Sequence, residues 1–210
     1  MITTKTITVF GASGRVGRLV VSLALSEGYT VIAQVHKHSN LAEHPKLIIV
    51  QGDVHDPKVI TESLRGSDAV ISTLSSWGSP NKDVLSTAMN HVAVAMRGMG
   101  MSRIVSLTGA DARARGDDLG IIHRLSYMLI MIVGRKVLKD GEAHIRLLEQ
   151  SDLDWTVIRS PVMNSAKSAV YRLSDKRPLP WQTISRSSVA TALLNQLGSE
   201  HRSQQAPFIL

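Results

Sequence analysis

The stretch Val9–Arg18, VFGASGRVGR, stands near the start of the chain and carries a glycine at every third position. The apolar, β-branched run TITVF (6–10) leads into it, and a segment with apolar residues at helical spacing follows it. Glycine destabilises strands and helices alike, so its repetition at a strand-to-helix turn indicates that something approaches the backbone closely. In this setting Gly11 permits a tight turn, Gly14 leaves room for a pyrophosphate, and Gly17 lets the helix pack on the sheet.

Predicted strands and helices alternate along the rest of the chain. We expect strands at 6–10, 30–35, 46–52, 68–74, 103–109 and 154–160, and a short one within 207–210. We expect helices at 14–28, 56–66, 82–97, 118–150 and 185–198, the fourth broken near Gly134 or Gly141. This alternation predicts an α/β fold with a doubly wound parallel sheet in three layers. Residues 1–210 should form a single domain, with a small irregular segment at about 161–184 on the substrate side.

The composition narrows the function classes. The 210 residues include no cysteine, which excludes disulfides and thiolate chemistry, and the formal net charge is +7. The basic residues are scattered and no nucleic-acid module is recognisable, so we expect no nucleic-acid partner. The most apolar segment, 125–133, is far shorter than the ~20 residues of a membrane span, and the start of the chain lacks a signal peptide. We therefore expect a cytoplasmic protein with no membrane partner.

The end of the second strand indicates which dinucleotide would bind. A carboxylate at this position is typical of NAD sites, but residues 33–40 read AQVHKHSN and contain no acid. His36, Lys37, His38 and Ser39, with Arg15 nearby, suit a 2′-phosphate, so NADP is favoured over NAD. The alternative is a solvated basic loop. The histidines have no third ligand near them in the sequence, so we predict no metal site.

Several further motifs bear a resemblance to a known family. The sequence resembles the atypical short-chain dehydrogenases/reductases, in the branch with NmrA-like proteins, NAD(P)H-flavin reductases and biliverdin-IX-beta reductase. The resemblance spans nearly the whole chain and implies a Rossmann fold. It rests on VFGASGRVG (9–17), GDVHD (52–56), DAVISTL (68–74), IVSLTGA (104–110), LEQSDLDWTVIRSPVM (148–163) and ISRSSVA (184–190).

The resemblance implies a set of cofactor contacts at the strand ends. Residues 73–74 would pass under the cofactor, 106–108 would lie near the nicotinamide, and 160–162 would flank its carboxamide. Asp53 would accept a hydrogen bond from adenine, or else shape a turn. Lys139 would approach the ribose or substrate, or else be a solvated lysine. The full set is Gly11, Ser13, Gly14, Arg15, Val16, Gly17, His36, Lys37, Asp53, Val54, Thr73, Leu74, Ser106, Leu107, Thr108, Lys139, Ser160, Pro161 and Val162.

The chain departs from the wider superfamily in its catalytic motif. The usual Tyr-x-x-x-Lys is missing, because Tyr29, Tyr127 and Tyr171 are each followed four residues later by a residue other than lysine. Hydride transfer to a flavin or quinone does not need that acid, because the protein mainly orients two rings. The expected function is an NADPH-dependent oxidoreductase for a small conjugated acceptor. The alternative is a non-catalytic NADP(H) sensor of the NmrA-like type. Either would be a monomer or homodimer.

Other candidates have a structural and a functional interpretation. His123 and His144 are more often structural than proton donors. The apolar segment 127–134 is either buried core, a subunit contact, or a wall for a flat aromatic substrate, and Trp77 could face the same cleft. Many relatives have aspartate where this chain has Ser188, a change that concerns a helix cap.

Overall fold

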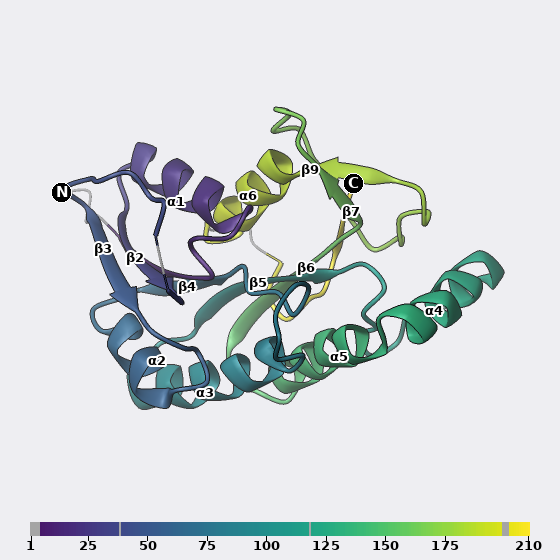
Figure 1. The fold of residues 1–210 in the computed structure, drawn as a ribbon, viewed down its shortest axis with the longest axis horizontal. Coiled ribbons are helices and arrows are strands. Elements are labelled where there is room, and N and C mark those ends of the chain that lie inside the picture. Colours follow the sequence, from purple (N-terminus) through teal and green to yellow (C-terminus); the bar gives the residue numbers. More distant parts are fainter. Residues whose placement is uncertain (1–4, 38, 118, 199–201) are drawn as a thin grey trace.

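A sheet with helices on both faces forms the body of the protein (Figure 1). We describe it from a computed structural model that covers residues 5–37, 39–117, 119–198 and 202–210. The loop residue His38 and the expected helix start at Asp118 lie outside these ranges.

The strand order across the sheet is β3-β2-β1-β4-β5-β6-β10-β8. The pairings from β3 through β10 are parallel, and β8 joins β10 in antiparallel orientation. This order confirms the doubly wound parallel α/β sheet expected from the sequence. The strands are β1 (Thr6–Phe10), β2 (Thr30–Val35), β3 (Leu47–Gln51), β4 (Ala69–Ser72), β5 (Arg103–Gly109), β6 (Asp154–Ser160), β8 (Leu173–Ser174) and β10 (Phe208–Ile209).

The helices divide between the two faces of the sheet and make the three predicted layers (Figure 1). One face carries α1 (Gly17–Ser26) and α6 (Arg186–Asn195). The other carries α2 (Pro57–Leu64), α3 (Val84–Gly98) and α5 (Arg135–Glu149).

Successive side chains along each strand point to opposite faces of the sheet, and they form two separate apolar clusters. Ile7 and Val9 of β1 point to the α1 and α6 side, where Leu193 joins them. Phe10 points to the other side and packs in the cluster that contains Ile104 and Leu148. Burial on both faces explains why the strands read as continuous apolar runs.

The predicted long fourth helix is two helices, α4 (Ile121–Val133) and α5, which meet at Gly134. Gly141 lies inside α5, so the break occurs at the first of the two expected glycines. No residue of α4 is buried, and the helix projects beyond the end of the domain (Figure 1). The expectation that 127–134 forms buried core is therefore wrong.

The segment expected to be irregular contains short strands. β7 (Val162–Asn164) and β9 (Thr183–Ser185) form a parallel pair apart from the main sheet. Ser185 caps α6 by accepting a hydrogen bond from the amide of Ser188, whose own hydroxyl bonds the carbonyl of Val170 at 2.6 Å. The cap is thus Ser185, and Ser188 fastens the 161–184 segment to α6. No helix in the described ranges is long and apolar enough to cross a bilayer.

Candidate functional site

The carboxyl ends of β1 to β6 meet at one edge of the sheet, and the predicted contacts lie there. The strand order reverses between β1 and β4, which is where doubly wound sheets bind their ligands. The structure places the glycine loop after β1, His36 and Lys37 after β2, and Asp53 and Val54 after β3. Thr73 and Leu74 follow β4, residues 106–108 end β5, and residues 160–162 join β6 to β7. Lys139 differs, because it lies in the second turn of α5.

Only glycine fits at two positions of the loop. Gly11 has φ +72°, a left-handed conformation that other residues rarely adopt, and a Cβ there would lie 3.1 Å from the carbonyl carbon of Thr73. A Cβ on Gly17 would lie 2.2 Å from the carbonyl oxygen of Gly11. Gly17 is therefore required for close packing of α1 against the loop, as the sequence predicted.

The loop also presents backbone donors. The amide of Gly14 is used within the loop, donating to the carbonyl of Gly11 at 2.9 Å. In the described ranges the amides of Ser13, Arg15 and Val16 have no acceptor, and Ser13 and Arg15 are exposed. Free amides at the start of a helix are suited to an anion, because the helix dipole adds to their partial positive charge. These groups fit the diphosphate of a dinucleotide.

Thr73 and Gln34 fix the loop to the neighbouring strands. The hydroxyl of Thr73 donates to the carbonyl of Phe10 at 2.9 Å, so β4 and the end of β1 are tied together beneath the loop. The amide of Ala12 donates to the carbonyl of Gln34, and the side chain of Gln34 donates to the carbonyl of Gly52 at 2.7 Å. The ends of the strands on which the cofactor would rest are held by these bonds.

The carboxylate of Asp53 forms hydrogen bonds with His55. Its Oδ1 accepts the His55 amide at 2.9 Å and lies 2.6 Å from His55 Nδ1. The backbone hydrogen bond is the main reason that the pKa of Asp53 is lowered, and the side-chain hydrogen bond raises the pKa of His55. The structure thus shows the turn-shaping role of Asp53. Its Oδ2 faces His36, whose Nδ1 is 4.0 Å away.

Ser106 is directed into the protein rather than toward the edge. It is fully buried, and its Oγ lies 2.9 Å from His144 Nε2 on α5. Burial lowers the pKa of His144 to about 4, so this imidazole is neutral and cannot act as an acid at neutral pH. A Cβ on Gly141 would lie 2.7 Å from Thr108 Oγ1, so α5 also packs tightly over Thr108.

Tyr127 and Lys139 meet although no Tyr-x-x-x-Lys motif links them. The Tyr127 hydroxyl and Lys139 Nζ are 3.5 Å apart, but both bind Glu142, which is almost fully buried. Arg113 completes the cluster, with Nε 2.9 Å from Glu142 and its guanidinium over the Tyr127 ring. The phenol proton is therefore donated to a carboxylate, the opposite of the arrangement that activates a catalytic tyrosine. This pairing depends on how α4 lies on α5, which a spacing rule does not detect.

Asp140 is a structural carboxylate that sequence reasoning missed. It is 4% exposed and accepts hydrogen bonds from the amides of Leu85 and Ser86, at 3.0 and 2.9 Å, and from the hydroxyl of Ser76. The amides belong to the first turn of α3, where Asp83 makes no side-chain cap. α5 therefore caps α3 across a separation of more than fifty residues, which leaves no local signal.

Asp111 was also missed. It follows β5 at the ligand edge, is half-buried, and has no hydrogen-bond partner within the described chain. Burial raises its pKa, and the charges of Arg177 and His123 act against that rise. Nearby, Arg177 and Arg159 both pair with Asp117 and lie over the ring of Phe208, which fixes the 110–117 loop to β6 and β10.

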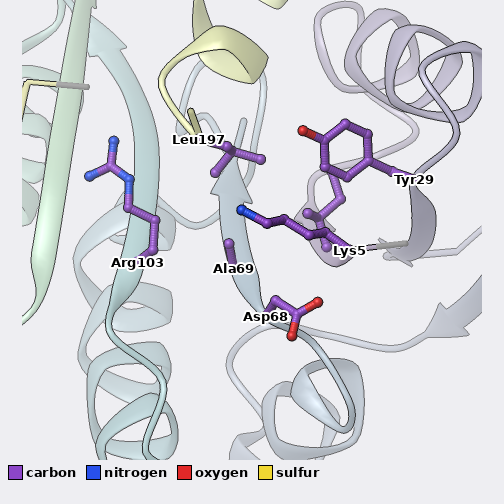
Figure 2. Close-up of a pocket in the computed structure, with 7 residues that line it drawn as sticks. Lys5, Tyr29, Asp68, Ala69, Arg103 and Leu197 are labelled. Carbon is purple, nitrogen blue, oxygen red and sulfur yellow. The ribbon is translucent and has the colours of Figure 1, made fainter. Parts of the chain in front are cut away.

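A small cavity at the other edge of the sheet is a separate feature. It measures about 100 Å³ and is lined by residues at the strand starts, including Lys5, Tyr29, Asp68 and Arg103 (Figure 2). Arg103 is occupied there by the carbonyl of Gln196 and by Asp154. Ligands of doubly wound sheets bind at the carboxyl ends of the strands, so this cavity is not the candidate cofactor site. Tyr29 lines the cavity and therefore lies far from the candidate cofactor site.

The chain belongs to the NAD(P)H-binding family, whose model matches residues 11–200. Among solved structures, it is similar to a short-chain dehydrogenase/reductase from Veillonella parvula in complex with NADP (TM-score 0.78, 14% identity, 98% of this chain and 94% of that one). It is also similar to ChuY, an anaerobilin reductase from Escherichia coli O157:H7 (0.75, 18%, 98% and 97%), and to the oxidoreductase ylbE from Lactococcus lactis (0.81, 16%, 97% and 90%). These likenesses establish the Rossmann fold and agree with the resemblance to the atypical short-chain dehydrogenases/reductases.

Proposed function

We propose that the protein is an NADPH-dependent oxidoreductase that transfers a hydride to a small conjugated acceptor, such as a flavin or a quinone. The observation that carries this proposal is a glycine loop that fits a dinucleotide, in a chain whose tyrosine–lysine pair has its hydroxyl bound to Glu142. The first feature favours the cofactor. The second indicates that this pair is not the tyrosine–lysine acid of the wider superfamily, because the Tyr127 hydroxyl donates to Glu142.

The residues at the ligand edge have separate roles in this proposal. The free amides of Ser13, Arg15 and Val16 hold the diphosphate. Leu74, Leu107 and the 160–162 turn flank the nicotinamide end. Thr73 and Ser106 act beneath the surface, because their hydroxyls are already bound by protein groups. Bound NADPH supplies the hydride, and the chain orients the two rings.

Charge at the adenosine end supports NADP over NAD. No carboxylate ends β2, while Arg15, His36 and Lys37 are exposed there. Asp53 is the nearby acid, and His55 holds one of its oxygens. A 2′-phosphate would therefore meet mainly cationic groups, which form its strongest hydrogen bonds.

Reduction of a flavin or quinone also takes up one proton. We assign its donor to Asp111, because the raised pKa of this carboxyl keeps it protonated at higher pH than an exposed aspartate. The NADP complex of one structural neighbour and the anaerobilin reductase activity of another support this chemistry by analogy.

The decisive test follows NADPH oxidation against FMN, riboflavin, a quinone and a biliverdin-like tetrapyrrole. We expect oxidation well above the enzyme-free rate with at least one of them, and loss of that rate in Gly14→Asp, which removes the cofactor. Tight NADPH binding without turnover on any acceptor would overturn the proposal and favour the sensor function.

A further inference from the structure

Helix α4 turns its apolar side away from the protein. Seven large apolar side chains are 49% to 82% exposed: Ile121, Ile122, Leu125, Met128, Leu129, Ile132 and Val133. At the angular spacing of an α-helix they fall on one face, an arc of about 140°. Monomeric proteins rarely leave so large a continuous apolar patch in water, so this face is expected to meet a partner.

Two polar side chains of α4, His123 and Tyr127, face inward instead. His123 Nε2 lies 3.2 Å from the carbonyl oxygen of Pro178, and the Tyr127 hydroxyl donates to Glu142. The helix is therefore fixed to the domain by its polar side, and its apolar side is held outward. α4 also projects from the end of the molecule, beyond α5 (Figure 1).

Two exposed tryptophans flank the helix. Trp77 is 64% exposed, and its ring would lie 3.1 Å from a Cβ on Gly134, at the carboxyl end of α4. Trp181 is 68% exposed and lies in the turn after Pro178, which contacts the amino-terminal part of α4 through His123. Tryptophan is enriched where proteins meet the interface between lipid and water, because one edge of its ring is apolar and the other polar.

The charged residues within 119–136 are all basic. Arg124, Arg135 and Lys136 are exposed, and no carboxylate pairs with them in the described ranges. Residues 119–136 contain no aspartate or glutamate. A second copy of the chain would bring the same cations to the contact without an acid to meet them. An anionic lipid surface supplies the complementary charge.

We propose that α4 docks the protein on the surface of an anionic membrane, with its apolar face and the two tryptophans inserted among the lipid headgroups. Such a helix lies in the plane of the interface and does not cross the bilayer. This docking is independent of the reaction proposed above. It revises the sequence-based expectation of no membrane partner, which excluded a span but not a helix lying on the surface.

Co-sedimentation with lipid vesicles tests the proposal. The parent should bind vesicles that contain phosphatidylglycerol more strongly than vesicles of phosphatidylcholine alone. Ile132→Glu should weaken that binding by at least about tenfold, because it places a charge at the most exposed position of the face. Val94→Glu is the matched control, since Val94 is 65% exposed on α3, away from α4. It should bind like the parent.

A second pair of variants tests the charges. Arg135→Gln with Lys136→Gln should lower binding to phosphatidylglycerol vesicles by roughly tenfold or more, because each cation near the surface is attracted to the anionic headgroups. The matched control removes two exposed cations from α2 and its end, Lys58→Gln with Arg65→Gln, and should have a much smaller effect. Circular dichroism of each variant checks that the fold is retained.

Three results would overturn the proposal. The first is an absence of binding to phosphatidylglycerol vesicles. The second is an equal loss of binding in Ile132→Glu and Val94→Glu. The third is a dimer, detected by sedimentation velocity, that Ile132→Glu dissociates while no vesicle binding is seen. That result would assign the apolar face to a second copy of the chain.

Discussion

At the scale of single residues, the carboxyls of Glu142 and Asp111 have pKa values shifted in opposite directions. Glu142 accepts hydrogen bonds from Arg113, Tyr127 and Lys139, so its pKa is lowered in spite of burial and it stays charged. Asp111 lacks such donors, and burial raises its pKa. The pKa values of a buried and a half-buried carboxyl thus shift in opposite directions, because Glu142 accepts hydrogen bonds that Asp111 lacks.

No tyrosine is expected to be essential for activity. Tyr127→Phe removes a hydroxyl that donates to Glu142, and Tyr171→Phe removes one that accepts a hydrogen bond from the Asn195 side chain. Both variants should keep turnover of NADPH with a flavin or quinone within a few-fold of the parent, and so should Tyr29→Phe. A positioned general acid contributes ~10²–10⁴-fold, so a hundredfold fall in kcat for Tyr127→Phe would identify it as a proton donor.

Asp111→Asn should reduce kcat and change its pH profile. A protonated carboxyl is needed in the proposed role, so the parent rate should fall as pH rises through the raised pKa of Asp111. The asparagine variant should be slower by about tenfold or more and should lack that inflection. Steady-state rates across the pH range measure both effects. An unchanged profile in the variant would remove Asp111 from the mechanism.

His144 should make the protein sensitive to acid. An unfolded histidine has a pKa near 6.5, and His144 in the folded protein has a pKa of about 4. Between these values the unfolded chain binds a proton that the folded protein does not, so stability falls as pH falls from 6.5 toward 4. The full effect is about 3 kcal/mol. Urea unfolding of His144→Gln should show a smaller loss over this range, whereas the exposed-histidine control His44→Gln should follow the parent.

At the scale of elements, the first turn of α3 depends on a carboxylate from α5. Asp140→Ala leaves the amides of Leu85 and Ser86 without their acceptor in a buried place, and should lower the free energy of unfolding by about 3 kcal/mol. Asp83→Ala changes the residue that precedes α3 but removes no cap bond, so its effect should stay within about 0.5 kcal/mol. Equal losses in the two variants, measured by urea unfolding, would contradict this assignment.

The elements themselves were largely predictable, because local patterns determine them. The six main strands and the order of helices follow from periodicity, and glycine positions limited the break in the fourth helix to Gly134 or Gly141. The orientation of α4 was not predictable in this way. Its periodicity marks an apolar face but does not say whether that face turns inward, and here the polar contacts of His123 and Tyr127 hold it outward.

Part of the candidate site was predictable for the same reason. The glycine loop and the strand ends are local features that the parallel topology brings to one edge. The contacts Asp140–Ser86 and Tyr127–Glu142 join separate helices, so they depend on packing that no short motif encodes. For Ser106, the position in β5 was predicted, but its hydrogen bond with His144 was not.

At the scale of the whole molecule, one edge of the sheet gathers the dinucleotide loop, the cations after β2 and the carboxyl of Asp111. The other edge holds the small cavity around Arg103 (Figure 2). Membership of the NAD(P)H-binding family and the glycine loop support the proposal that the cofactor binds at the first edge. The central claim is that NADPH binds there by its diphosphate and its 2′-phosphate.

Calorimetric titration of NADPH and NADH into the parent and Gly14→Asp tests that claim most directly. The parent should bind NADPH more tightly by roughly 1–3 kcal/mol, because the 2′-phosphate gains charge-assisted hydrogen bonds. Gly14→Asp adds bulk and negative charge at the diphosphate position, and should bind neither nucleotide while its circular dichroism stays native-like. Equal affinities of the parent for the two nucleotides, or a folded Gly14→Asp that binds NADPH as the parent does, would contradict the account.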